Sequence, residues 1–196
     1  MADSFSILNP PRLVDGQCID WPELSGLGLA LALATLARRQ GGPLLVAAPD
    51  GYFARQLRDD LQQLDAPRAE LFPDWEILPY DLYSPHPDLI SRRLDLLSRL
   101  PGMSEGIVIA PVSALIQRLA PPAWIQGQSL NLAVGETLDP SQFRNRLSDA
   151  GYLLSDQVWQ PGQFAVRGSV LDLWPMGRPQ PYRLELFDDE VESIRV

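Results

Sequence analysis

Residues 43–50, Pro43-Leu-Leu-Val-Ala-Ala-Pro-Asp50, decide the fold class of this chain because they join a strand directly to a helix. The unbroken apolar run is typical of a strand buried on both faces of a parallel sheet. Gly41 and Gly42 precede the run and end an apolar helix predicted over residues 24–39. Pro49 and Asp50 follow it and open a second helix. A helix on each side of a buried strand indicates an α/β fold.

The same alternation continues toward the middle of the chain. We predict a short strand over residues 70–72, a third helix from Asp88, a buried strand over 106–110 and a helix over 112–119. On the third helix, the side chains expected to face the core are Leu89, Ile90, Leu94, Leu97 and Leu100. Those expected to face water are Arg92, Arg93, Asp95 and Arg99. This order predicts a first domain, residues 1–125, built on a doubly wound parallel sheet.

After Pro121 and Pro122 the pattern changes to glycine turns and alternating strands. A strand over 130–134 is followed by a helix that Asp139 caps and that runs to about residue 150. Three antiparallel strands then follow, over residues 164–174, 182–187 and 191–196. We predict a small second domain of the α+β class, residues 126–196. Because its last strand runs to the C-terminus, we expect the chain to be a fragment of a longer protein.

The composition restricts the classes of partner. A formal net charge of -9 argues against a surface that binds nucleic acid through phosphate neutralisation alone. The single cysteine, Cys18, excludes an internal disulfide and fits a reducing cytoplasm. The N-terminal residues lack the pattern of a signal peptide, and the longest apolar run, residues 27–36, is about half as long as a membrane span. We therefore expect a soluble, cytoplasmic protein that has no membrane partner.

A glycine turn at the start of the first helix raises the question of nucleotide binding. Gly26 and Gly28 could let a phosphate approach a helix N-terminus, although a tight entry into a packed helix explains them as well. A phosphate-binding loop needs a lysine and a serine or threonine, and Leu29 and Ala30 stand in their places. All sixteen basic residues of the chain are arginine. The turn therefore argues against ATP hydrolysis.

Two other patterns could carry chemistry. The acids of residues 188–190 follow an apolar strand, as in a magnesium-binding acidic box, but they also suit a hairpin turn, which we favour. His86 could act as a base near Asp81 or Asp88, yet the chain offers no second histidine and no activated nucleophile. We predict no catalytic residue and no metal site.

Arginines beside an aromatic residue mark a candidate protein interface in the second domain. Residues 183, 185 and 187 share one face of a strand, so Arg183 and Phe187 lie on either side of Glu185, and Arg167 ends a neighbouring strand. Arginine and exposed aromatic side chains are typical of interface hot spots. The alternative is a surface arginine paired with an acid, together with a core phenylalanine.

Several blocks of the sequence resemble the N-terminal region of the bacterial transcription-repair coupling factors (Mfd). In the first half they are residues 72–81 (Phe-Pro-Asp-Trp-Glu-Ile-Leu-Pro-Tyr-Asp), 84–86, 91–94 and 109–113. In the second half they are Arg167-Gly-Ser-Val-Leu-Asp-Leu-Trp-Pro-Met176 and Tyr182-Arg-Leu-Glu-Leu-Phe-Asp-Asp-Glu190. The resemblance extends from about Glu23 to the last residue.

That region of the family is similar to UvrB, so the resemblance implies a RecA-like first domain and a second domain that docks on UvrA. It implies a degenerate nucleotide site, because Glu23, Leu29 and Ala30 stand where glycine, lysine and threonine are expected. It places Arg167, Arg183 and Phe187 on the UvrA-binding surface. It implies no cofactor for this chain, since ATP and Mg²⁺ belong to later motor domains, as do the contacts with RNA polymerase and DNA.

The leading hypothesis is a non-catalytic module that recruits UvrA for transcription-coupled nucleotide excision repair. Its parent protein would be an ATP-dependent DNA translocase that displaces stalled RNA polymerase. One alternative is an ATP-binding, UvrB-like helicase subunit of excision repair. Another is an intramolecular clamp, in which the second domain is held against a later domain of the parent protein.

Overall fold

The computed structural model describes residues 6–77, 82–127 and 132–196, and these form two compact units. The first unit consists of the residues up to Asp74 and of Leu100–Arg118, and the second consists of Trp75–Arg99 and Leu119–Val196. The predicted domain bounds, 1–125 and 126–196, differ from this division in where they place residues 75–99 and 119–125, and they stay a prediction.

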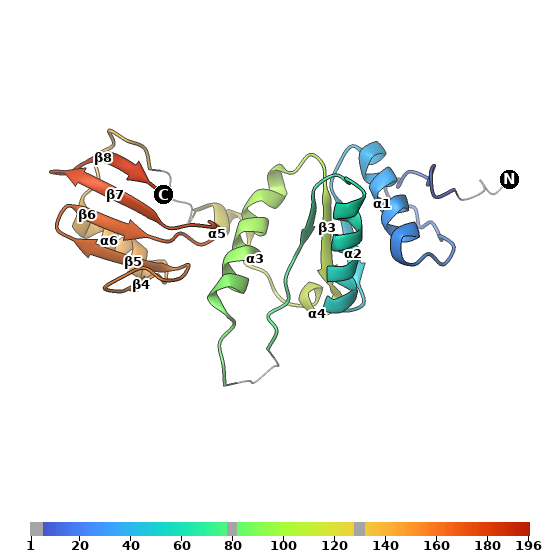
Figure 1. Ribbon diagram of the computed structural model, residues 1–196, viewed down its shortest axis with the longest axis horizontal. Helices are drawn as coiled ribbons and strands as arrows, with labels where there is room; N and C mark the ends of the chain where they lie inside the picture. Colours follow the sequence, from blue (N-terminus) through green and yellow to red (C-terminus); the bar gives the residue numbers. More distant parts are fainter. Residues whose placement is uncertain (1–5, 78–81, 128–131) are drawn as a thin grey trace. The chain divides into compact units, whose positions relative to one another are not determined.

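The first unit is a three-stranded parallel sheet with helices, in the strand order β1-β3-β2 (Figure 1). Its elements are α1 (Gly26–Gln40), β1 (Leu44–Ala48), α2 (Gly51–Gln63), β2 (Ala69–Leu71), a 3-10 turn (Leu100–Gly102), β3 (Ile107–Pro111) and α4 (Val112–Leu115). These elements confirm the α/β class and the strands predicted around residues 45, 70 and 108.

Local signals fix the ends of these elements. Gly41 ends α1 in a left-handed conformation, with φ of 73°, which a glycine adopts without steric cost. Asp50 caps α2, because its side-chain oxygen accepts a hydrogen bond of 2.8 Å from the backbone N–H of Phe53. All five residues of β3 are buried, as expected for the central strand. Leu57 and Leu61 of α2 join the apolar cluster formed with β1 and β3.

β1 differs from its prediction as a strand buried on both faces. It lies at an edge of the sheet that the described residues form, and the side chain of Leu45 is 65% exposed. The first and last residues of the strand, Leu44 and Ala48, are buried. The apolar run indicated the strand correctly, but hydrophobicity alone does not reveal a strand's position in the sheet.

The second unit is a five-stranded mixed sheet with α6 on one face, in the order β4-β5-β6-β7-β8 (Figure 1). Its elements are α3 (Pro87–Arg99), α5 (Pro122–Gly127), α6 (Pro140–Asp149), β4 (Leu153–Leu154), β5 (Gln163–Arg167), β6 (Val170–Leu173), β7 (Tyr182–Phe187) and β8 (Glu190–Arg195). The β4–β5 pair is parallel and the other three pairs are antiparallel.

Two predicted strands of this unit were wrong. The strand expected over residues 164–174 is a hairpin, because the chain turns at Gly168, which has φ of 60°. Residues 132–134 form no strand, and the remainder of the strand expected over 130–134 lies outside the described residues. The helix α5 and the short strand β4 were not predicted. The strand β7 has the predicted bounds, and β8 lies within one residue of them.

The helix α6 begins and packs as its sequence predicts. Asp139 accepts hydrogen bonds from the backbone N–H groups of Ser141 (2.8 Å) and Gln142 (3.1 Å). Phe143 and Leu147 of α6 are buried against the sheet. The buried members of this apolar cluster are Leu138, Phe143, Leu147, Phe164, Leu171, Leu173, Leu184, Leu186 and Val191.

The buried side of α3 also differs from its prediction. Arg93, expected to face water, is only 2% exposed, and its guanidinium lies 4.0 Å from the ring centre of Trp75. A planar guanidinium stacks well on an aromatic ring, which explains how an arginine occupies this position. Ser91 is buried as well, and its hydroxyl accepts a hydrogen bond of 2.7 Å from the backbone N–H of Gly177. Leu100, expected to face the core, is 39% exposed.

Within the described residues, no helix combines the length and the apolar character that are needed to cross a bilayer.

Candidate protein-interaction site

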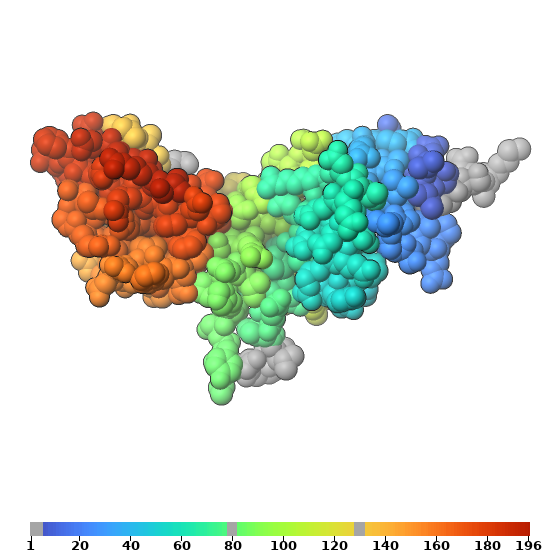
Figure 2. All heavy atoms as spheres, in the orientation of Figure 1, coloured from blue at the N-terminus to red at the C-terminus, as the bar shows by residue number. Residues whose placement is uncertain are grey.

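The sheet of the second unit has an inner face, against α6, and an outer face. Along β7, Leu184 and Leu186 point into the apolar cluster, whereas Arg183, Glu185 and Phe187 lie on the outer face. This alternation confirms that the three residues share one face, as the sequence predicted. The strands β7 and β8 form part of the surface of this unit (red in Figure 2).

Asp172 of β6 lies opposite Arg183 and holds two arginines on the outer face. Arg183 donates two hydrogen bonds to its carboxylate, of 2.6 and 2.9 Å. Arg167 donates one longer bond of 3.2 Å. The hydrogen bond from Arg183 lowers the pKa of Asp172 below its usual value, and the same contact raises the pKa of Arg183. The Asp172 side chain is 13% exposed, whereas about half of each arginine side chain is exposed.

A second ion pair extends the outer face onto β8. Arg195 and the hydroxyl of Ser193 each donate a hydrogen bond of 2.9 Å to one carboxylate oxygen of Glu185. Arg195 was not predicted as part of this face. The alternation of β8 would have placed residues 193 and 195 on one face, but the pairing with Glu185 depends on the strand register.

Phe187 is the exposed aromatic residue of β7, with 71% of its surface accessible. It ends the strand, and the chain then turns at Asp188, which has φ of 52°, and pairs back through Glu190. The predicted hairpin turn is therefore formed by Asp188 and Asp189, and Glu190 begins β8. Among the described residues, no three His, Cys, Asp or Glu side chains form a group that could hold a metal ion.

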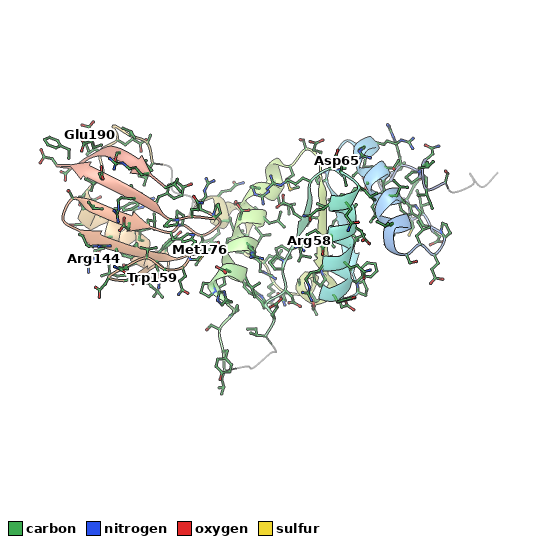
Figure 3. All side chains as sticks on the ribbon, in the orientation of Figure 1. Arg58, Asp65, Arg144, Trp159, Met176 and Glu190 are labelled. Carbon is green, nitrogen blue, oxygen red and sulfur yellow. The ribbon has the colours of Figure 1, made fainter. Side chains whose placement is uncertain are left out.

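An open hollow of about 520 Å³ adjoins the arginines on this face. It is lined by Arg167, Arg183 and Arg195, and by residues 157–159 from the loop before β5. In this loop Trp159 is 74% exposed (Figure 3). Trp159 was not predicted as part of a site, because the sequence of an aperiodic loop does not reveal which way a side chain points.

The glycine turn lies at the start of α1. Gly26 has φ of 52°, Ala30 is fully buried, and no strand precedes α1 within residues 6–25. A small hollow of about 180 Å³ lies between the first turn of α1 and α2. Its lining residues are Ser25, Gly26, Leu29, Phe53, Gln56, Leu57 and Asp60.

His86 lies outside both hollows. Its Nδ1 atom is 3.8 Å from the carboxylate of Asp88, and its side chain is 66% exposed. Asp81, the other acid considered as its neighbour, lies outside the described residues. The backbone N–H of Asp88 also donates a hydrogen bond of 3.3 Å to the Nδ1 atom of His86.

Comparisons with known proteins find one matching family and several similar proteins. Residues 130–196 match the family described as the UvrB interaction domain. The chain is 44% identical over 174 residues to the transcription-repair-coupling factor of Escherichia coli (strain K12), which is 89% of this chain and 15% of that protein. It is 43% identical to the Haemophilus influenzae factor, over 85% of this chain and 14% of that protein. The Bacillus subtilis factor is 37% identical, over 88% of this chain and 15% of that protein.

This chain thus spans about 15% of the length of these relatives. The predicted resemblance is confirmed over most of the chain. The outer face of β5–β8 lies within residues that match the UvrB interaction domain, in a chain that is similar to one part of the transcription-repair-coupling factors.

Proposed function

We propose that this chain recruits UvrA, as a module of a transcription-repair coupling factor that acts in transcription-coupled nucleotide excision repair. One observation carries the proposal. Within the residues that match the UvrB interaction domain, Arg167 and Arg183 converge on Asp172, and Phe187 lies exposed on the same strand as Arg183. Exposed aromatic and arginine side chains on one rigid face are the features of a protein-binding hot spot.

In this proposal the first unit is a RecA-like scaffold with a degenerate nucleotide site, and the chain is not an enzyme. Leu29 lines the small hollow at the start of α1, where a working loop needs a lysine ammonium group. ATP, Mg²⁺, DNA and RNA polymerase would be bound by other parts of a longer protein, which acts in the cytoplasm as a DNA translocase. The similarity to much longer coupling factors supports this division of roles.

Binding of purified UvrA to this chain tests the proposed surface. We expect Arg183→Ala or Phe187→Ala to weaken binding by about 30-fold or more, the loss typical of a hot spot. Arg144→Ala is the matched control for arginine, because Arg144 is exposed on α6, on the other side of the sheet. Tyr52→Ala is the control for the aromatic residue, because Tyr52 is 72% exposed on α2. Unchanged titrations with both outer-face variants would refute the assignment.

ATP binding by a UvrB-like helicase subunit is the rival function. The hollow beside Gly26, at a helix N-terminus, is the observation that favours it. Calorimetry with Mg-ATP separates the two functions. We expect at most millimolar binding, and micromolar binding would support the rival.

An intramolecular role for the same face has its own test. If the outer face is held against a later domain of the parent protein, this chain should bind UvrA more tightly than the full-length protein does. Equal affinities would contradict that role and leave the UvrA-binding surface unaffected.

A further inference from the structure

Trp159 presents its indole on a loop whose backbone is fixed. The side-chain oxygen of Gln163 accepts hydrogen bonds from the backbone N–H of Trp159 (2.9 Å) and from that of Gln160 (3.3 Å). Ser155 donates a further bond of 2.6 Å to the carbonyl of Gln157. The loop is therefore held while the indole stays 74% exposed. An aromatic side chain on a backbone that is already ordered binds a partner at a lower cost in conformational entropy.

The side chains that line the hollow beside Trp159 include more guanidinium groups than carboxylates. The lining includes the three arginines Arg167, Arg183 and Arg195 and the two acids Asp172 and Glu185. Arg183 donates short hydrogen bonds to both carboxylate oxygens of Asp172, whereas Arg167 donates one hydrogen bond of 3.2 Å to one of them. Arg167 is therefore the arginine that a carboxylate from outside can engage at the smallest loss of internal hydrogen bonding.

We propose that the partner surface reaches past the arginines to Trp159, and that the hollow receives a carboxylate of UvrA with an apolar group beside it. The carboxylate pairs with Arg167, and the apolar group packs on the indole. Two observations select this occupant. Among the side chains of the lining there is one more guanidinium than there are carboxylates, and Arg167 and Arg183 belong both to the hollow and to the outer face. This inference rests on the proposed function and extends its surface by a residue that the resemblance does not assign.

The test compares two tryptophans in a titration with purified UvrA. Trp159→Ala is expected to weaken binding by about 30-fold, as for a hot-spot tryptophan. Trp124→Ala, which removes an indole that is 55% exposed on α5, is expected to leave binding unchanged. Trp159→Phe should retain much of the affinity, because it keeps an aromatic ring at the site.

Gln163→Ala tests whether the fixed loop matters. It leaves the indole in place but removes the acceptor for two backbone N–H groups. We expect about a 2- to 10-fold loss, the cost of ordering a freed side chain and loop on binding. A loss in Gln163→Ala without any loss in Trp159→Ala would contradict the proposal.

The charge of the hollow is tested by ionic strength. The affinity of the wild-type chain should fall with added salt more steeply than that of Arg167→Ala, because the variant lacks the guanidinium that meets the carboxylate. Equal salt dependence would refute the carboxylate. Suppose that Trp159→Ala binds UvrA as tightly as the wild type, whereas Arg183→Ala and Phe187→Ala bind more weakly. The extension of the surface to Trp159 is then wrong, and the proposed function stands. If the wild-type chain does not bind UvrA at all, the proposed function fails first.

Discussion

At the scale of single residues, Asp172 organises the outer face. Its carboxylate receives Arg183 through two hydrogen bonds and Arg167 through one, and it is far less exposed than either arginine. It therefore sets the direction of both guanidinium groups before any partner arrives. Asp172 acts through the arginines, as a positioning residue.

The lowered pKa of Asp172 predicts a pH dependence of stability. Because its pKa is lower in the folded chain, its carboxylate stabilises the fold above the unfolded pKa, which is about 3.9. This contribution is lost as the pH falls through the folded pKa. We expect urea unfolding to show the wild type as more stable than Asp172→Asn at neutral pH, with a gap that closes below about pH 4. A gap that stays constant from neutral pH to about pH 3 would contradict this account.

At the scale of elements, the caps and turns of the second unit determine where its strands and its helix begin. Asp139 caps α6 by accepting hydrogen bonds from two backbone N–H groups. Gly168 divides the alternating residues 164–174 into the two strands β5 and β6. These two residues bring Phe164 and Phe143 into one apolar cluster. The helix cap and the turn therefore place the apolar side chains on the inner face of the sheet, and the charged side chains lie on the outer face.

The cap of α6 gives a direct prediction of stability. Asp139→Ala should lower the free energy of unfolding by about 1 kcal/mol, because two N–H groups of the first turn lose their acceptor. Asp149→Ala is the matched control at the opposite end of the same helix. There an aspartate is unfavourable to the helix dipole, so its removal should be neutral or slightly stabilising. Equal losses in the two variants, measured by urea unfolding, would refute the capping role.

The sequence predicted the elements better than it predicted their contacts. Apolar runs located β1 and β3, and alternation placed Arg183 and Phe187 on one face. Asp172 was missed because residues 164–174 were read as one strand, although glycine after Arg167 is typical of a hairpin turn. Asp172 lies opposite Arg183 only because the chain reverses direction at Gly168. Helical periodicity likewise placed Arg93 in water, because it does not reveal that Trp75 lies on that side.

At the scale of the whole molecule, the described residues form two apolar clusters that share no residue. One belongs to α1, α2 and the parallel sheet, and the other belongs to α6 and the mixed sheet. Each cluster is drawn from a single compact unit. The parallel sheet of the first unit and the outer face of the second therefore depend on different sets of buried side chains.

This separation predicts local effects of core substitutions. Leu61→Ala in the first cluster and Leu147→Ala in the second should each cost about 2–5 kcal/mol, since both side chains are fully buried. Hydrogen exchange followed by mass spectrometry should show faster exchange in β3 for Leu61→Ala and in β6 and β7 for Leu147→Ala. Faster exchange throughout both units in either variant would show that the two clusters unfold together.

The three arginines of the outer face have a consequence for regulation. Acetylation acts by neutralising the ammonium group of lysine, and this sequence contains no lysine. Guanidinium groups also stay protonated throughout the physiological pH range. Neither lysine acetylation nor a change of pH within the physiological range can therefore remove the positive charges of this face.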